Sequence, residues 1–372
     1  MTPDSPLSVL HMKGKDAIQL SSIASLGQLS PEAFQHQDDR KAAEAVCSVP
    51  VFPQIVKLFA GELHEKVMRL HHLSHCIRVS PRQAVELNRH YVHAARILSM
   101  PEIPELYISP EYTMNAFAMG VKRPVIVVTR GLLDSMTTPE ITAVLAHELG
   151  HVKCGHMVNR TIASMIAMFG VMGISQLIPV LGSAAMLAVA APLCYWSRMA
   201  ELSCDRAALL VVREARIIAG TLAKLGGWPR SFGEVDFPSL REQTDEYDRL
   251  DDDTVASIVK VISLIQSDIY LSHPLPINRV HRILQWSESD QYRRILAGDY
   301  KHKEGELPPR TCEACGQVLG ATDLNCTNCS READAATAGP ACTQCGYPIP
   351  NPRPRFCGRC GHSLTSPGSA TA

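Results

Sequence analysis

The sequence predicts a mostly helical α+β fold with one small β-sheet, followed by two small cysteine-rich modules near the C-terminus. Apolar residues recur at helical spacing along much of the chain before residue 300, whereas β-branched runs typical of strands occur only between residues 105 and 130. Eight of the 13 cysteines lie after residue 311, in closely spaced pairs. A chain of 372 residues, 46% of them hydrophobic, is long enough for a large core and for more than one domain.

The secondary structure can be assigned in order from apolar periodicity and β-branched runs. We expect amphipathic helices over 54–76 and 82–99, extended segments at 106–108, 114–120 and 125–129, a long helix from about 138, a helical segment over 198–224, a solvated acidic loop over 242–253, and helices over 254–268 and 277–296.

The long helix has two alternative start points. Thr138 as the N-cap would put Pro139 at the first helical position, which suits proline. Thr137 as the N-cap would instead pair with Glu140 in a capping box. Both alternatives begin the helix at the same place to within one residue.

Changes in composition divide the chain into five segments. In chain order, we expect an N-terminal helical region over 1–100, a main domain over 101–298, a linker over 299–311, and the cysteine-rich modules over 312–330 and 341–362.

Residues 161–197 form an apolar segment that contains no Asp, Glu, Lys or Arg. Pro179 and Gly182 divide it into two pieces, 161–178 and 183–197. A membrane-spanning helix needs ~20 apolar residues, so a transmembrane hairpin, an interfacial hairpin and a buried helix pair all remain open. We favour membrane association, with the buried pair as the main alternative.

Charge and cysteine usage exclude several classes of protein. Lys and Arg number 36 against 37 Asp and Glu, and a net charge of −1 argues against a strongly basic nucleic-acid binder. The N-terminus has no basic stretch followed by an apolar one, so we expect no signal peptide. An odd number of unevenly placed cysteines does not fit a secreted disulfide framework, which predicts a cytoplasmic protein.

The main chemical signal is a His-Glu-x-x-His sequence at residues 147–151, within the long helix. Residues four apart share a helix face, so His147 and His151 can bind the same ion. Glu148 lies about 100° around the helix axis, beside that ion, where a carboxylate can take a proton from a metal-activated water. Zinc is the natural occupant of a site built from nitrogen and carboxylate ligands.

A catalytic zinc site needs a third protein ligand, and Glu201 is the candidate. Asp205 lies one helical turn later and would orient a ligand histidine. From the residues alone, an ordinary solvated carboxylate at position 201 is an equal alternative. We interpret Cys154 and Cys204 as small buried residues and His156 as a structural residue at the end of a helix.

These motifs resemble those of the HtpX-type and CAAX-prenyl-endopeptidase zinc metallopeptidases. The resemblance covers roughly residues 100–290 and includes a His-Pro pair at 273–274 that is followed by an arginine. It implies a mostly helical, zincin-like peptidase domain in which zinc is bound by His147, His151 and Glu201, with Glu148 as the catalytic base.

The resemblance also assigns roles to residues outside the two motifs. It implies that His273 stabilises the tetrahedral intermediate and that Arg279 supports the site geometry or approaches the substrate backbone. HtpX itself carries transmembrane helices before its zinc helix, whereas residues 1–137 here contain none, so we expect a mostly soluble body with at most one apolar hairpin. An extended peptide would add as an extra strand along Asn115, Ala116, Phe117 and Ala118.

The C-terminal cysteines form two quartets, each made of two C-x-x-C turns. Two such turns can close a tetrahedral shell around one zinc ion, and the resulting modules resemble zinc ribbons. Closed sites of this kind are structural, so the sequence predicts one catalytic and two structural zinc ions. The first quartet is Cys312, Cys315, Cys326 and Cys329, and the second is Cys342, Cys345, Cys357 and Cys360.

The sequence therefore predicts a zinc-dependent endopeptidase that acts on protein or peptide substrates, with ribbons that recruit a partner or the substrate. One alternative is a non-catalytic adaptor that uses the peptidase fold as a scaffold, although the intact His-Glu-x-x-His motif favours the enzyme. Another is nucleic-acid binding through Arg353, Arg355 and Arg359 in the second ribbon. That basic patch is weak, so a protein partner is favoured.

Overall fold

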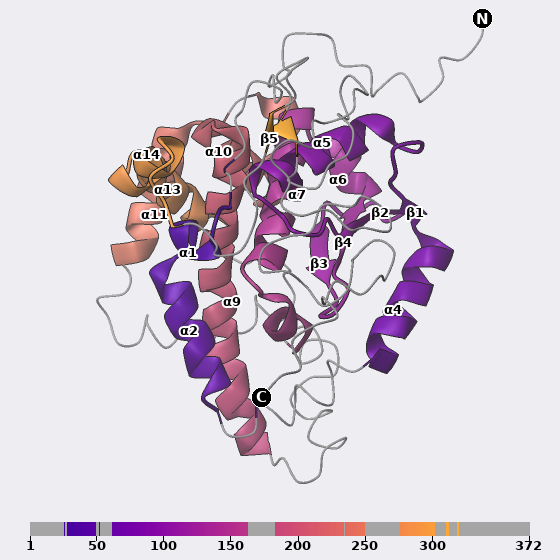
Figure 1. Cartoon of the computed structure of the whole chain (residues 1–372). Helices are drawn as coiled ribbons and strands as arrows, with labels where there is room; N and C mark the ends of the chain where they lie inside the picture. The colour runs from indigo at the N-terminus through magenta and orange to yellow at the C-terminus, as the bar shows by residue number, and fades with distance from the viewer. Residues whose placement is uncertain are drawn as a thin grey trace, which may run out of the picture.

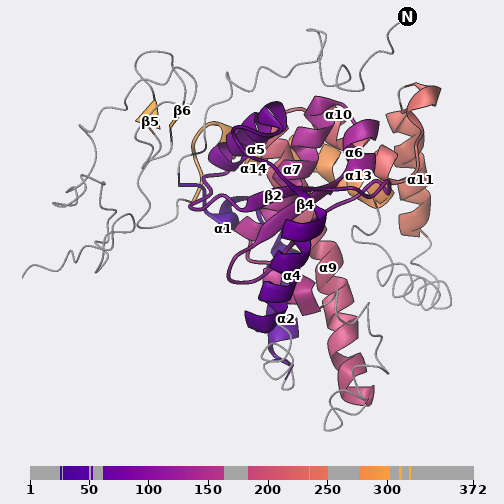
Figure 2. The same cartoon turned by 90° about the vertical axis from the view of Figure 1, so that its right-hand side faces the viewer.

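A small β-sheet lies against a group of helices in the computed structural model, and one long helix extends past it (Figure 1). Figure 2 shows α2, α4 and α9 projecting in the same direction beyond the sheet. The structure describes residue 26, residues 28–49, 52, 62–162, 183–233, 235–249, 276–301, 310–311 and 318–319.

Helices make up most of this described part, which agrees with the expected α+β class. The longer ones are α2 (Gln37–Cys47), α4 (Glu62–His75), α5 (Val85–Ile97), α7 (Thr138–Lys153), α9 (Ser183–Val212), α10 (Ala215–Leu225), α11 (Phe237–Arg249) and α13 (Pro276–Ser287). The shorter ones are α1 (Pro31–Phe34), α6 (Arg130–Ser135) and α14 (Asp290–Leu296).

The sheet has four strands in the order β1-β2-β4-β3. Strands β2 and β4 are parallel, whereas β1 and β3 pair antiparallel with β2 and β4. All five residues of β4 are buried, as its unbroken β-branched sequence predicts for a central strand. Because β3 is last in the strand order, it lies at an edge of the sheet. The strands are β1 (Ile77–Arg78), β2 (Glu105–Ser109), β3 (Ala116–Met119) and β4 (Val125–Thr129).

Helix α7 begins at Thr138, shortly after strand β4 and the short helix α6. The backbone N–H and the hydroxyl of Thr137 both donate to Oε2 of Glu140, at 2.8 and 2.9 Å. Thr137 is thus the N-cap, and the capping box is the correct one of the two alternatives.

The largest difference from the sequence prediction concerns residues 183–197. They are the first half of the 30-residue helix α9, which continues through Pro192 to Glu201 and beyond. They are thus continuous with the helical segment expected from residue 198, because good helix formers on both sides of the proline outweigh the one hydrogen bond that it removes. Residues 163–182 lie outside the described part. Within that part, no helix has the length and apolar character needed to cross a membrane.

Two smaller predictions were also wrong. The expected acidic loop is helical as far as Arg249, because Phe237 and Leu240 of α11 pack against the core and leave the acidic side chains on the outer face. The helix expected over 277–296 is interrupted near Ser289, whose hydroxyl accepts a hydrogen bond from the N–H of Tyr292 and caps α14.

Candidate metal centre

Helices α7 and α9 pack closely at Gly150. A methyl group at this position would lie 2.9 Å from Cβ of Ala207 and 3.1 Å from Cα of Cys204, so a glycine is required for the observed approach. The contact brings the histidines of α7 opposite the carboxylates of α9.

We expect the substitution Gly150→Ala to push the two helices apart. Overpacking of this kind should lower the free energy of unfolding by about 1–3 kcal/mol and weaken metal binding. Gly220 is a matched control inside α10, because a methyl group there would meet only Oε1 of Glu140 at 3.8 Å. Gly220→Ala should instead stabilise the protein by about 0.5–1 kcal/mol. Urea unfolding of both variants tests this, and equal effects would contradict the close helix contact.

The two imidazoles of α7 converge on one carboxylate of α9. Nε2 of His147 lies 3.3 Å from Oε2 of Glu201, and Nε2 of His151 lies 3.1 Å from Oε1. The three residues are between 0% and 6% exposed. Two ring nitrogens and a carboxylate, buried and directed at one another, form a donor set that fits a divalent cation such as zinc.

Cys204 also belongs to this cluster, since its sulfur lies within 4.8 Å of ligand atoms of His147 and His151. Cys204 is therefore a second candidate for the third ligand, whereas the sequence alone indicates only a small buried residue at this position. Its sulfur lies 3.7 Å from Nδ1 of His156, whereas each oxygen of Glu201 contacts one Nε2. The geometry therefore favours Glu201.

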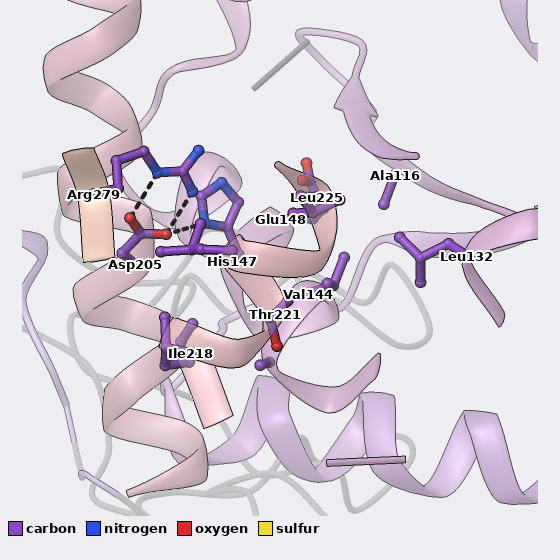
Figure 3. Close-up of a pocket in the computed structure, with 13 residues that line it drawn as sticks. Ala116, Leu132, Val144, His147, Glu148, Asp205, Ile218, Thr221, Leu225 and Arg279 are labelled. Carbon is purple, nitrogen blue, oxygen red and sulfur yellow. Dashed lines mark hydrogen bonds and ion pairs between the residues drawn. The ribbon is translucent and has the colours of Figure 1, made fainter. Parts of the chain in front are cut away.

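Hydrogen bonds hold the carboxylates of α9 in place, and Figure 3 shows those that Asp205 forms with Arg279 and His147. Arg279 of α13 donates through Nε and Nη2 to Asp205 and through Nη1 to Oε2 of Glu201, at 2.8, 2.6 and 2.7 Å. Asp205 in turn accepts a hydrogen bond from Nδ1 of His147 at 3.0 Å, which leaves Nε2 directed at Glu201. Of the two roles expected for Arg279, these contacts favour support of the site geometry.

These charges control the protonation of the ligand side chains. Burial lowers the pKa of His147, but Glu201 and Asp205 outweigh burial and raise the pKa to about 9. Burial and the charge of Arg160 lower the pKa of His151 well below its ordinary value. The pKa values of the two imidazoles are thus shifted in opposite directions, although both histidines lie on the same helix face.

Glu148 is completely buried and lines a cavity of about 30 Å³ beside His147. This volume holds one or two water molecules. Apolar side chains from α7 and α10 and Ala116 of the edge strand line the same cavity, as Figure 3 shows. The carboxylate therefore shares this cavity with His147 and with Ala116 of the edge strand.

Sequence reasoning missed a group of residues around His151. Nη1 of Arg160 lies 2.6 Å from Nε2 of His151 and 3.4 Å from Oε1 of Glu201. His156, which we had interpreted as structural, lies with its Nδ1 3.1 Å from Nδ1 of His151. Its Nε2 lies 3.0 Å from Asp39, which is 117 positions away in the sequence. No local pattern identifies such a partner.

Several predicted site residues lie outside the described part of the chain. They are His273, Cys312, Cys315, Cys326, Cys329, Cys342, Cys345, Cys357 and Cys360. The short strands β5 (Arg310–Thr311) and β6 (Val318–Leu319), which flank the first C-x-x-C turn, pair antiparallel.

Comparison with known proteins agrees with this arrangement. Residues 81–287 match peptidase family M48, which is more than half of the chain. The chain belongs to peptidase family M48. A plastoglobule-localized metallopeptidase 48 of Arabidopsis thaliana is 32% identical over 271 residues, which cover 72% of this chain and 76% of that protein.

Bacterial relatives support the same assignment. A protease HtpX homolog of Desulfatibacillum aliphaticivorans is 34% identical over 175 residues, 40% of this chain and 56% of that protein. Another from Sulfurovum is 51% identical over 67 residues, 18% of this chain and 24% of that protein. No solved structure matches the chain. The resemblance to HtpX-type peptidases is confirmed, and this M48 protein is a metallopeptidase by family.

Proposed function

We propose that the protein is a zinc-dependent endopeptidase. The observation that carries this proposal is the convergence of His147, His151 and Glu201, with Glu148 buried beside them on the same helix as the histidines. The two histidines and Glu201 would hold the ion. When bound, zinc would lower the pKa of a water molecule and polarise the scissile carbonyl group.

The side chains around the ion have three further roles: proton transfer, positioning of the ligands and stabilisation of the oxyanion. Glu148 takes a proton from the attacking water and later delivers it to the leaving amine. Asp205 and Arg279 hold His147 and Glu201 in place through the hydrogen bonds described above. His273 donates to the oxyanion, as the family resemblance implies.

The substrate would bind along strand β3. The strand is at an edge of the sheet, and its first residue, Ala116, lines the cavity with His147 and Glu148. A peptide that pairs with Asn115–Ala118 would be held by backbone hydrogen bonds with its carbonyl groups beside the cavity. This mode of binding selects extended protein or peptide substrates.

The remaining segments would bring the enzyme to its substrates. The two cysteine quartets would each hold a structural zinc ion and recruit a protein partner or the substrate, and their thiolates suit the reducing cytoplasm. Residues 161–197 would add contact with a lipid surface. The apolar sequence of this segment and the plastoglobule-localized relative support such contact.

Metal removal tests this proposal. The full chain should bind about three zinc ions, whereas a non-catalytic adaptor would need only about two. Casein hydrolysis should stop when a chelator removes the ions and return when zinc is restored. The variant His147→Ala should lose one ion per chain and all hydrolysis. Hydrolysis that persists after the chelator has removed all zinc would overturn the proposal.

A further inference from the structure

Asp39, a buried carboxylate of the N-terminal region, is linked to the metal centre by hydrogen bonds through His156. Asp39 of α2 is 0% exposed, and its Oδ2 accepts hydrogen bonds from Ser203 at 2.6 Å, from Gln35 at 2.9 Å and from His156 at 3.0 Å. Its other oxygen has no hydrogen-bond partner among the described residues. Burying an unpaired carboxylate oxygen is costly, so packing alone does not explain this aspartate.

The contacts around His151 determine where its proton lies. The guanidinium group of Arg160 has only donors, so Nε2 of His151, 2.6 Å away, must be the acceptor. The proton of His151 is therefore on Nδ1, which donates to Nδ1 of His156 at 3.1 Å. His156 then carries its own proton on Nε2, directed at Asp39. A single set of donors and acceptors satisfies these three contacts. Oε1 of Glu201, 3.1 Å from the unprotonated Nε2 of His151, accepts from Nη1 of Arg160 instead.

We propose that Asp39 and His156 form a relay of hydrogen bonds that holds His151 in the tautomer and orientation that binds zinc. The proposal rests on the proposed function. Both ligand histidines are then oriented by a carboxylate: Asp205 contacts His147 directly, and Asp39 acts on His151 through His156. Asp39 and His156 are positioning residues, since neither contacts Nε2 of a ligand.

The relay makes the N-terminal region part of the metal centre. Asp39 lies outside the segment that matches family M48, which begins at residue 81. Ser203 of α9 ties α2 to the site, because its hydroxyl donates to Asp39 and accepts the backbone N–H of His36 at 2.9 Å. Docking of α2 against α9 therefore affects how tightly the ion binds.

Zinc affinity of the full chain tests the relay. His156→Phe keeps the ring, which packs edge-on against Trp196, but offers no acceptor to His151. It should weaken the binding of one zinc ion about 10–100-fold. His156→Asn keeps an acceptor in the place of Nδ1 and should recover most of that loss. Asp38→Asn, a neighbouring change on a more exposed carboxylate, should bind zinc as the wild type does.

The outcomes separate the relay from the proposed function. If the wild type holds no more zinc than His147→Ala, the proposed function fails. If the wild type holds the additional ion and His156→Phe holds it equally tightly, only the relay fails. A measurement on the wild type avoids any loss of folding: the side-chain nitrogen resonances of His151 in the metal-stripped protein should show a protonated Nδ1. A protonated Nε2 would overturn the relay.

Discussion

The substitution Glu148→Gln should lower the rate of casein hydrolysis about 10²–10⁴-fold, the usual contribution of a general base. Glutamine has nearly the same shape as glutamate but cannot accept a proton at neutral pH. The zinc content should not change, because the ligand atoms of His147, His151 and Glu201 are untouched. The measurement is turnover of casein at saturating zinc, with the bound zinc of each variant determined in parallel.

The control for this experiment is Glu86→Gln on helix α5. Glu86 is exposed and forms an ion pair with Arg89 three residues along the same helix, so its loss should change turnover less than about twofold. If Glu148→Gln hydrolyses casein at the wild-type rate with its zinc retained, Glu148 is not the base. If Glu148→Gln loses the ion, the substitution has disturbed the site, and Glu148→Asp is measured in its place. The shorter carboxylate of aspartate should also lower the rate of hydrolysis.

Local features of the site could be predicted from the sequence because a helix fixes them. His147 and His151 lie one turn apart on α7, and Glu201 and Asp205 lie one turn apart on α9, so each pair necessarily shares a face. The β-branched run over residues 125–129 likewise identified a strand, which the structure confirms. In each case the residues that decide the structure are near neighbours in the chain.

Features that depend on tertiary packing could not be predicted in this way. The start of α9 was misplaced because the uncharged run of residues 161–197 ends at Arg198, whereas the helix is continuous across this position and Leu193 and Trp196 pack in the interior. The partnership of Asp39 with His156 joins residues 117 positions apart, and neither residue carries a motif. They meet because α2 and α7, whose C-terminal end His156 follows, both pack against α9.

The largest loss of stability is expected for Arg279→Met. Arg279 is 4% exposed and contacts two buried carboxylates, Asp205 and Glu201. Burial lowers the pKa of this arginine, but the two acidic partners outweigh burial and raise it above its ordinary value. Methionine fills a similar volume without charge, so the variant removes the guanidinium group that contacts both buried carboxylates and leaves them with His147 and Arg160. The free energy of unfolding should fall by about 3–5 kcal/mol.

The matched control is Arg282→Met on the exposed side of the same helix, where a change of about 0.5 kcal/mol or less is expected. Unfolding in urea with and without zinc then separates two explanations for the loss in Arg279→Met. If Arg279 compensates the ligand carboxylate, zinc should restore part of the lost stability, because the ion supplies positive charge at Glu201. If Arg279 only fills space in the core, Arg279→Met should lower the free energy of unfolding only slightly, and by the same amount with and without zinc. A loss no larger than that of Arg282→Met would show that the carboxylates do not need this arginine.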